Sequence, residues 1–226
     1  MAIYSKDSKL SDALLSYPTL LPVVDRLGIH LGVEDKTIKE ICLKDNIEVD
    51  FFLSIINTFI DEDYFPQRAS SIFSLDKTID YLEKTDAYYQ NIQLPNIVNH
   101  FERLLKISGE NNNLAFIKNF FEDIRKELSS LILYEKEELF PSLLNQNSKD
   151  FSEPRLIEGY LEIEDKLHDL LTFFIVHLKG EYNVNLSIAV VSGIFMLHKD
   201  IHENNRIRKR ILLPLIEQVA HSRHIK

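Results

Sequence analysis

Cysteine, glycine and proline are all scarce in this chain, which has one cysteine, six glycines and seven prolines among 226 residues. The single Cys42 excludes an intrachain disulfide framework and a zinc site built from several cysteines. Because Ile41 and Leu43 flank it, we expect a buried structural thiol. The few glycines and prolines disfavour β-sandwiches, barrels and glycine-rich phosphate loops.

Basic residues are outnumbered by acidic ones, and the formal net charge is −9 with a pI near 5.4. Such a charge disfavours binding to nucleic acid or to anionic membranes, because both depend on basic surfaces. The first residues lack the apolar core of a signal peptide, and no apolar run is long enough to span a bilayer. The chain also has no nucleophile elbow, P-loop or dinucleotide fingerprint. We therefore expect a cytoplasmic protein outside these enzyme classes.

Four long stretches carry apolar residues at helical spacing, and a polar residue interrupts each stripe. Steps of three and four residues keep one face of a helix turned toward its neighbours. The interrupting residues should therefore point inward, where polar groups are costly unless they are paired. Together they predict a shared polar centre. The stripes are Leu75, Ile79, Leu82, Asp86, Tyr89; then Ile124, Leu128, Leu131, Glu135, Leu139; then Leu156, Tyr160, Ile163, Leu167, Leu170, Phe174; and finally Leu197, Ile201, Asn204, Arg208, Ile211, Leu215.

The chain divides into two parts whose helical patterns differ in length. Residues 1–65 hold short helical patterns broken by glycine, proline and asparagine, and we interpret them as a small helical N-terminal domain. A linker over 63–70 leads to the second domain, residues 66–226, whose patterns are longer. Long helices joined by short breaks are typical of an antiparallel four-helix bundle, so the predicted fold is all-α. The long patterns cover roughly 74–107, 112–145, 152–179 and 184–220.

Three segments carry a family resemblance. Residues 135–141, Glu-Lys-Glu-Glu-Leu-Phe-Pro, resemble the His-x-x-x-Glu…Leu-Phe-Pro signature of hemerythrin-like proteins. Residues 85–89, followed by Leu94-Pro95, resemble the first-helix motif of that superfamily. Residues 27–42 are similar to the small N-terminal domain of the repair-of-iron-centres (RIC, ScdA-like) family. The resemblance covers nearly the whole chain, with the segments in the same order.

The resemblance implies a bundle around a di-iron centre held by histidines and two carboxylates, in proteins reported to repair iron–sulfur clusters after oxidative or nitrosative damage. Of the six implied ligand positions, only Glu135 keeps the residue of the family. Leu131 offers no donor, and Arg208 is a permanent cation that repels a metal. The six positions are Asp86, Leu131, Glu135, Tyr160, Asn204 and Arg208.

These departures predict a metal-free, degenerate hemerythrin-like protein without a cofactor. We interpret it as a non-enzymatic regulatory or interaction module related to the stress response, binding an unidentified protein partner or a small ligand. The alternative keeps iron–sulfur cluster repair, or oxidative or nitrosative stress sensing, with a di-iron or single-metal site. A homodimer stays open, and we expect no membrane partner. Nucleic-acid binding through the N-terminal helices is a third, weaker option, which the acidic charge balance disfavours.

A second, weaker metal candidate is the i, i+4 pair of His198 and His202, a geometry that zinc uses. His168, His177 or His100 would have to supply a third ligand. The alternative is a pair that faces a groove or water.

The last helical pattern also carries a basic cluster of Arg206, Arg208, Lys209 and Arg210. We expect Lys209 and Arg210 to be surface charge near a helix end. An anion-binding or partner-binding patch is the alternative.

The family's two carboxylates, at positions 135 and 208, converge on the metals. We hypothesise that Arg208 occupies the vacated centre and pairs with Glu135, while Asp86, Tyr160 and Asn204 complete the hydrogen bonds. The alternative is that Arg208 extends to solvent and Glu135 lies on a wet helix face.

The substitution Arg208→Leu should lower the free energy of unfolding by about 3–5 kcal/mol, because it leaves the Glu135 carboxylate buried without its partner. Combining it with Glu135→Leu should be nearly neutral, since both charges then leave together. Melting experiments on the two single variants and the double variant measure this. Equal losses in all three variants would contradict the pairing.

Overall fold

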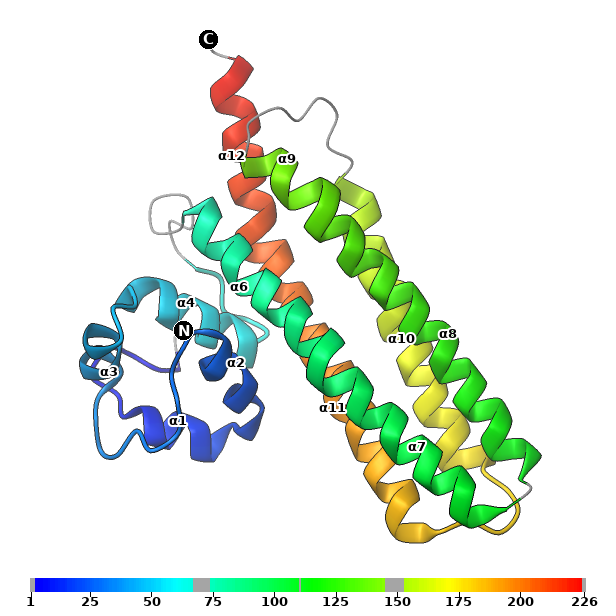
Figure 1. The fold of residues 1–226 in the computed structure, drawn as a ribbon. Helices are drawn as coiled ribbons and strands as arrows, with labels where there is room; N and C mark the ends of the chain where they lie inside the picture. The colour runs from blue at the N-terminus through cyan, green and yellow to red at the C-terminus, as the bar shows by residue number, and fades with distance from the viewer. Residues whose placement is uncertain (1–2, 67–73, 110, 145–152, 225–226) are drawn as a thin grey trace. The chain divides into compact units, whose positions relative to one another are not determined.

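The computed structural model describes residues 3–66, 74–109, 111–144 and 153–224, and these are folded almost entirely as helices (Figure 1). Within these ranges, β-structure is limited to one isolated antiparallel bridge between Lys9 and Thr37. The all-α prediction is therefore confirmed. Residues 67–70 of the predicted linker over 63–70, and the predicted break after residue 145, lie outside the described residues.

The helices follow the predicted patterns closely. Short helices come first: α1 (Leu10–Ser16), a 3₁₀ turn (Pro18–Leu20), α2 (Leu21–Arg26), α3 (Ile38–Lys44) and α4 (Val49–Ile60). The longer helices are α6 (Leu75–Tyr88), α7 (Leu94–Ser108), α8 (Asn112–Tyr134), α9 (Phe140–Leu144), α10 (Glu153–His177), α11 (Val184–Ile207) and α12 (Leu213–His224).

The chain forms two compact units with limits that differ from the predicted domains. The first unit comprises residues 1–85 together with 203–226, and the second unit comprises residues 86–202. The C-terminal helical segment thus packs with the N-terminal helices. The predicted domain boundary at residue 65 stays a prediction.

In the first unit, α4 is the central core helix, with Phe52, Ile55 and Ile56 fully buried. Asn57 of the same helix holds the start of the chain. Its Oδ1 accepts the backbone N–H groups of Ile3 and Tyr4, each at 3.0 Å, and its Nδ2 donates to the carbonyl of Tyr4 at 3.0 Å. A buried polar side chain is thereby satisfied while it anchors an irregular segment.

Helix α3 begins with a capping box, in which the Thr37 side chain accepts from the N–H of Glu40 and the Glu40 carboxylate accepts from the N–H of Thr37. The helix carries Cys42, which is fully buried. Burial, with the nearby Asp45 charge, raises the pKa of the Cys42 thiol to about 12. The predicted buried structural thiol is confirmed.

In the second unit, α7, α8, α10 and α11 contact one another around an apolar core. The Phe101 ring of α7 lies 5.4 Å from that of Phe121 on α8 and 6.0 Å from that of Phe174 on α10. Figure 1 shows α8 and α10 side by side, in agreement with their contacts. A Cβ on Gly193 of α11 would lie only 2.9 Å from Ile97 of α7, so these two helices also approach closely.

Helices α8 and α10 approach each other closely at Gly159. A Cβ placed there would lie 2.7 Å from Cδ2 of Leu131, which is closer than real Cβ contacts come. Glycine inside a helix costs about 1 kcal/mol relative to alanine. Here it lets Leu131 pack directly on the backbone of α10.

One helical stretch, Val184–Gln218, is long and apolar enough to cross a bilayer, and 33% of its most apolar window is buried. The expectation that no run has this length and composition is therefore wrong. A core helix of a globular protein meets the same criterion, so the stretch by itself does not indicate a membrane protein.

Replacing Gly159 by alanine should lower the free energy of unfolding by about 1–3 kcal/mol, because the added methyl group overlaps Leu131. In a Leu131→Ala background the same change should instead raise it by up to about 1 kcal/mol, since only the better helix propensity of alanine remains. Urea unfolding of the four variants measures both effects. A gain in stability from Gly159→Ala alone would contradict the close approach.

Candidate functional site

The polar residues that interrupt the four stripes are all buried. Glu135, Tyr160, Asn204 and Arg208 have 0% of their surface exposed, and Asp86 has 4%. Leu131 is half-buried. Helical spacing therefore placed these residues on the correct face. The side chain of Leu156, which begins the third stripe, lies outside the described residues.

Glu135 and Tyr160 meet inside the second unit. The Tyr160 hydroxyl donates a hydrogen bond to Oε2 of Glu135 at 2.6 Å, and both side chains are fully buried. A distance this short is typical of an O–H donor on an ionised carboxylate, which is among the stronger protein hydrogen bonds. The contact links the C-terminal end of α8 to α10.

Asn204 has a corresponding partner in the first unit. The hydroxyl of Tyr81, which is 1% exposed, donates to Oδ1 of Asn204 at 2.9 Å. Tyr81 lies outside the narrow stripe through Ile79 and Leu82, so that stripe alone did not predict it. The spacing of Thr78, Tyr81 and Thr85, all buried, was the signal for a wider inward face.

The full burial of Arg208 and Glu135 contradicts the alternative interpretation, in which both side chains reach water. Arg208 does not extend to solvent, and Glu135 does not lie on a wet helix face, because each has 0% exposure. That alternative is wrong. Arg208 belongs to the first unit and Glu135 to the second, and their pairing stays a prediction.

Three inward-facing residues of the predicted stripes each begin a π-helical turn. These turns are Tyr89–Gln93, Glu135–Leu139 and Arg208–Leu212, and a proline stands six residues after the start of each, at Pro95, Pro141 and Pro214. Proline lacks an N–H and clashes with the carbonyl four residues earlier in an α-helix. A locally widened turn accommodates both effects. Each π-helical turn also directs its first side chain inward, and Tyr89, Glu135 and Arg208 are each 0% exposed.

Two arginines of the first unit bind the C-terminal end of α4 and the segment that follows it. Arg206 donates to the carbonyl of Phe59 and forms an ion pair with Glu62 at 3.3 Å. Arg210 donates to the carbonyl of Tyr64 at 2.7 Å, and its Cζ lies 4.1 Å from the ring centre of Phe65. Guanidinium groups suit the end of a helix, where carbonyls lack partners.

The expectation that Arg210 is surface charge is therefore wrong. Its side chain is half-buried, and burial lowers the pKa of its guanidinium. Helical spacing could not reveal this role, because the carbonyls that Arg210 binds lie about 150 residues earlier in the chain. Lys209 is exposed, as expected.

The histidine pair of the second unit lies between α10 and α11. Nδ1 of His202 lies 2.8 Å from Oε2 of Glu164, and the His198 ring is 6.2 Å from that of His168. Burial is the main cause that lowers the pKa of His198. Among the residues that the structure describes, no three His, Cys, Asp or Glu side chains are placed to hold one metal.

The residues present do not fit the di-iron centre that the resemblance implies. The Glu135 carboxylate already accepts a hydrogen bond from Tyr160. Leu131 packs on Gly159 and has no donor atom. Arg208 places a permanent cation at the sixth ligand position, and iron prefers imidazole and carboxylate donors.

No family model matches the sequence, and no curated protein matches it. The assignment to hemerythrin-like proteins therefore stays a prediction that rests on the three segments quoted above.

The variant Tyr160→Phe should lower the free energy of unfolding by about 1–3 kcal/mol, because the buried Glu135 carboxylate loses a donor. The matched control is Tyr182→Phe, which removes the same atom from a residue that is 39% exposed. It should change stability by no more than about 0.5 kcal/mol. Urea unfolding of the two variants decides, and equal effects would contradict a structural role for the buried hydrogen bond.

Proposed function

We propose that the chain is a hemerythrin-like antiparallel four-helix bundle, preceded by a small helical domain, whose metal site has degenerated into a polar core. In this proposal it is a cytoplasmic, non-enzymatic regulatory or interaction module related to the stress response. Its partner is a protein or a small ligand, with no role for nucleic acid or a membrane.

The buried Glu135–Tyr160 hydrogen bond is the observation that carries the proposal. In a metalloprotein of the implied type, this carboxylate would face a cation. Here a phenol hydroxyl from α10 satisfies it at 2.6 Å. A buried carboxylate that has a protein donor needs no metal to offset its desolvation.

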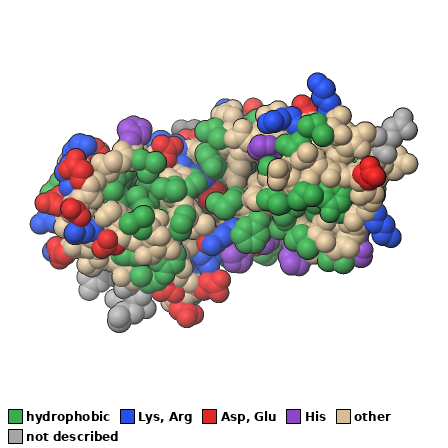
Figure 2. Space-filling view, turned by 90° about the horizontal axis from the view of Figure 1, so that it is seen from below, with side chains coloured by type: hydrophobic (Ala, Val, Ile, Leu, Met, Phe, Trp, Pro, Cys, Tyr) green, Lys and Arg blue, Asp and Glu red, His purple; other side chains and the backbone are tan. Residues whose placement is uncertain are grey.

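Exposed apolar side chains on the second unit support a role in interaction. Val184, Ile188 and Phe195 on α11 are 53–60% exposed, and Ile175 near the end of α10 is 71% exposed. In Figure 2, apolar side chains (green) and histidines (purple) gather on the long helices seen from below. Contiguous apolar surface on a folded protein commonly marks a site of association.

The alternative function, iron–sulfur cluster repair or stress sensing with a di-iron or single-metal site, has one observation in its favour. Two carboxylates, Asp86 and Glu135, are buried within the second unit, at 4% and 0% exposure. Carboxylates buried in a bundle are common iron ligands.

Iron content decides between the two functions. The protein is purified anaerobically under reducing conditions, offered ferrous iron, desalted, and then measured for bound metal and optical absorption. A positive control restores the implied donors through Asp86→His, Leu131→His, Tyr160→His, Asn204→His and Arg208→Glu in one variant.

We expect the natural chain to retain far less than one iron, while the restored variant gains iron if its bundle still folds, as circular dichroism would establish. About two irons per natural chain, with oxo-bridged absorption, would overturn the metal-free proposal and favour the repair function. A single tightly bound iron would favour the single-metal alternative.

A further inference from the structure

A groove lies between α8 and α10 on the surface of the second unit. Its volume is about 630 Å³, which falls within the range of small-molecule sites in proteins. Leu131 provides apolar surface along it, and Tyr134 adds an aromatic side chain. The groove therefore offers apolar surface that a small ligand could cover.

The groove owes its depth to Gly159, which lines it together with Leu131. Because a Cβ at position 159 would overlap Leu131, any other residue there would push the two helices apart or fill the space between them. Ile163, one turn further along α10, is 1% exposed and so lies beneath the surface. These residues form the apolar part of the lining.

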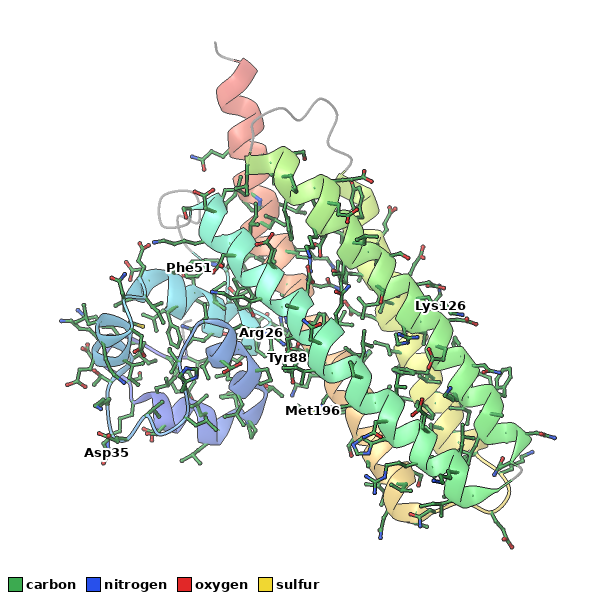
Figure 3. All side chains as sticks on the ribbon, in the orientation of Figure 1. Arg26, Asp35, Phe51, Tyr88, Lys126 and Met196 are labelled. Carbon is green, nitrogen blue, oxygen red and sulfur yellow. The ribbon has the colours of Figure 1, made fainter. Side chains whose placement is uncertain are left out.

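Charge in the groove is predominantly negative. Glu127 and Lys166 form an ion pair across it and offset each other. Glu138 and Glu162 also line the groove, are exposed, and form no ion pair with a described side chain. Lys126, the next cation along α8, pairs with Asp123 at 3.0 Å and points away from the core (Figure 3). Among the described side chains, Glu138 and Glu162 thus carry negative charge without an ion-pair partner.

These two carboxylates are spaced along the groove. The contacts Glu127–Lys166 and Leu131–Gly159 show that α8 and α10 run in opposite directions. Glu138 lies seven residues beyond Leu131, in the π-helical turn that follows α8, and Glu162 lies three residues beyond Gly159 on α10. The two residues are therefore on opposite sides of that contact. At about 1.5 Å per residue, their positions are roughly 10–15 Å apart along the helix axes.

We propose that this groove binds a linear aliphatic polyamine. Two of its ammonium groups pair with Glu138 and Glu162, and the methylene chain between them covers Leu131 and Tyr134. A small anion is disfavoured by the same charges, and a short monoamine reaches only one carboxylate. The proposal does not rest on the metal-free core, because the charged residues of the groove, Glu127, Glu138, Glu162 and Lys166, are not among the six implied ligand positions.

Isothermal titration of the natural chain with spermidine tests the proposal at physiological ionic strength, with butylamine as the single-charge control. We expect saturable binding of one spermidine per chain and much weaker binding of butylamine. The double variant Glu138→Gln, Glu162→Gln should weaken spermidine binding roughly five- to tenfold. Its matched control, Glu137→Gln with Glu158→Gln, removes two exposed charges outside the groove and should change affinity less than about twofold.

Two further variants shift binding in opposite directions. Lys166→Gln releases Glu127 from its ion pair and should tighten spermidine binding, because the groove gains a free carboxylate. Ser130→Trp places a large side chain at an exposed lining position and should abolish binding. Circular dichroism verifies that each variant is folded.

Absence of saturable binding would overturn the proposal. So would equal weakening by the groove variant and its control, since that result would reflect only the attraction of a polycation to an acidic protein. These outcomes are independent of iron content, so failure of this proposal is distinguishable from failure of the proposed function.

Discussion

The burial of the Glu135 carboxylate is the constraint on which the second unit depends. A carboxylate with no exposed surface is costly unless a donor compensates it, and Tyr160 provides one at 2.6 Å. That contact requires α8 and α10 to approach closely, and Gly159, the residue next to Tyr160, permits the approach. The π-helical turn that begins at Glu135 belongs to the same arrangement. The close packing at Gly159, the π-helical turn at Glu135 and the hydrogen bond from Tyr160 therefore depend on one another.

Polar side chains near the end of α11 are likewise bound by protein groups. Asn204 receives the Tyr81 hydroxyl, while Arg206 and Arg210 bind carbonyls at the end of α4 and just after it. Polar side chains that would be reactive in an open site are here occupied by other protein groups, which favours rigidity over chemistry. The groove between α8 and α10 and the exposed apolar side chains of α11 are open to ligands.

Much of the fold could be predicted because helical periodicity records which residues are inside. The inward positions of Glu135, Tyr160 and Arg208 followed from steps of three and four residues alone. Partners across helices could not be predicted, because periodicity gives a direction and no neighbour. Tyr81 and the role of Arg210 were missed for this reason. The sequence does contain a pattern for the π-helical turns, because a proline follows an inward stripe residue by six positions in three separate helices. A single such proline would not have predicted a π-helical turn.

The most direct test of the account is a crystal structure of iron-soaked protein, with anomalous diffraction recorded at the iron edge. The account predicts that the Glu135 carboxylate keeps its hydrogen bond to the Tyr160 hydroxyl and that no anomalous peak lies beside it. A peak within coordination distance of Glu135, with the Tyr160 hydroxyl displaced or bound to the metal, would contradict it.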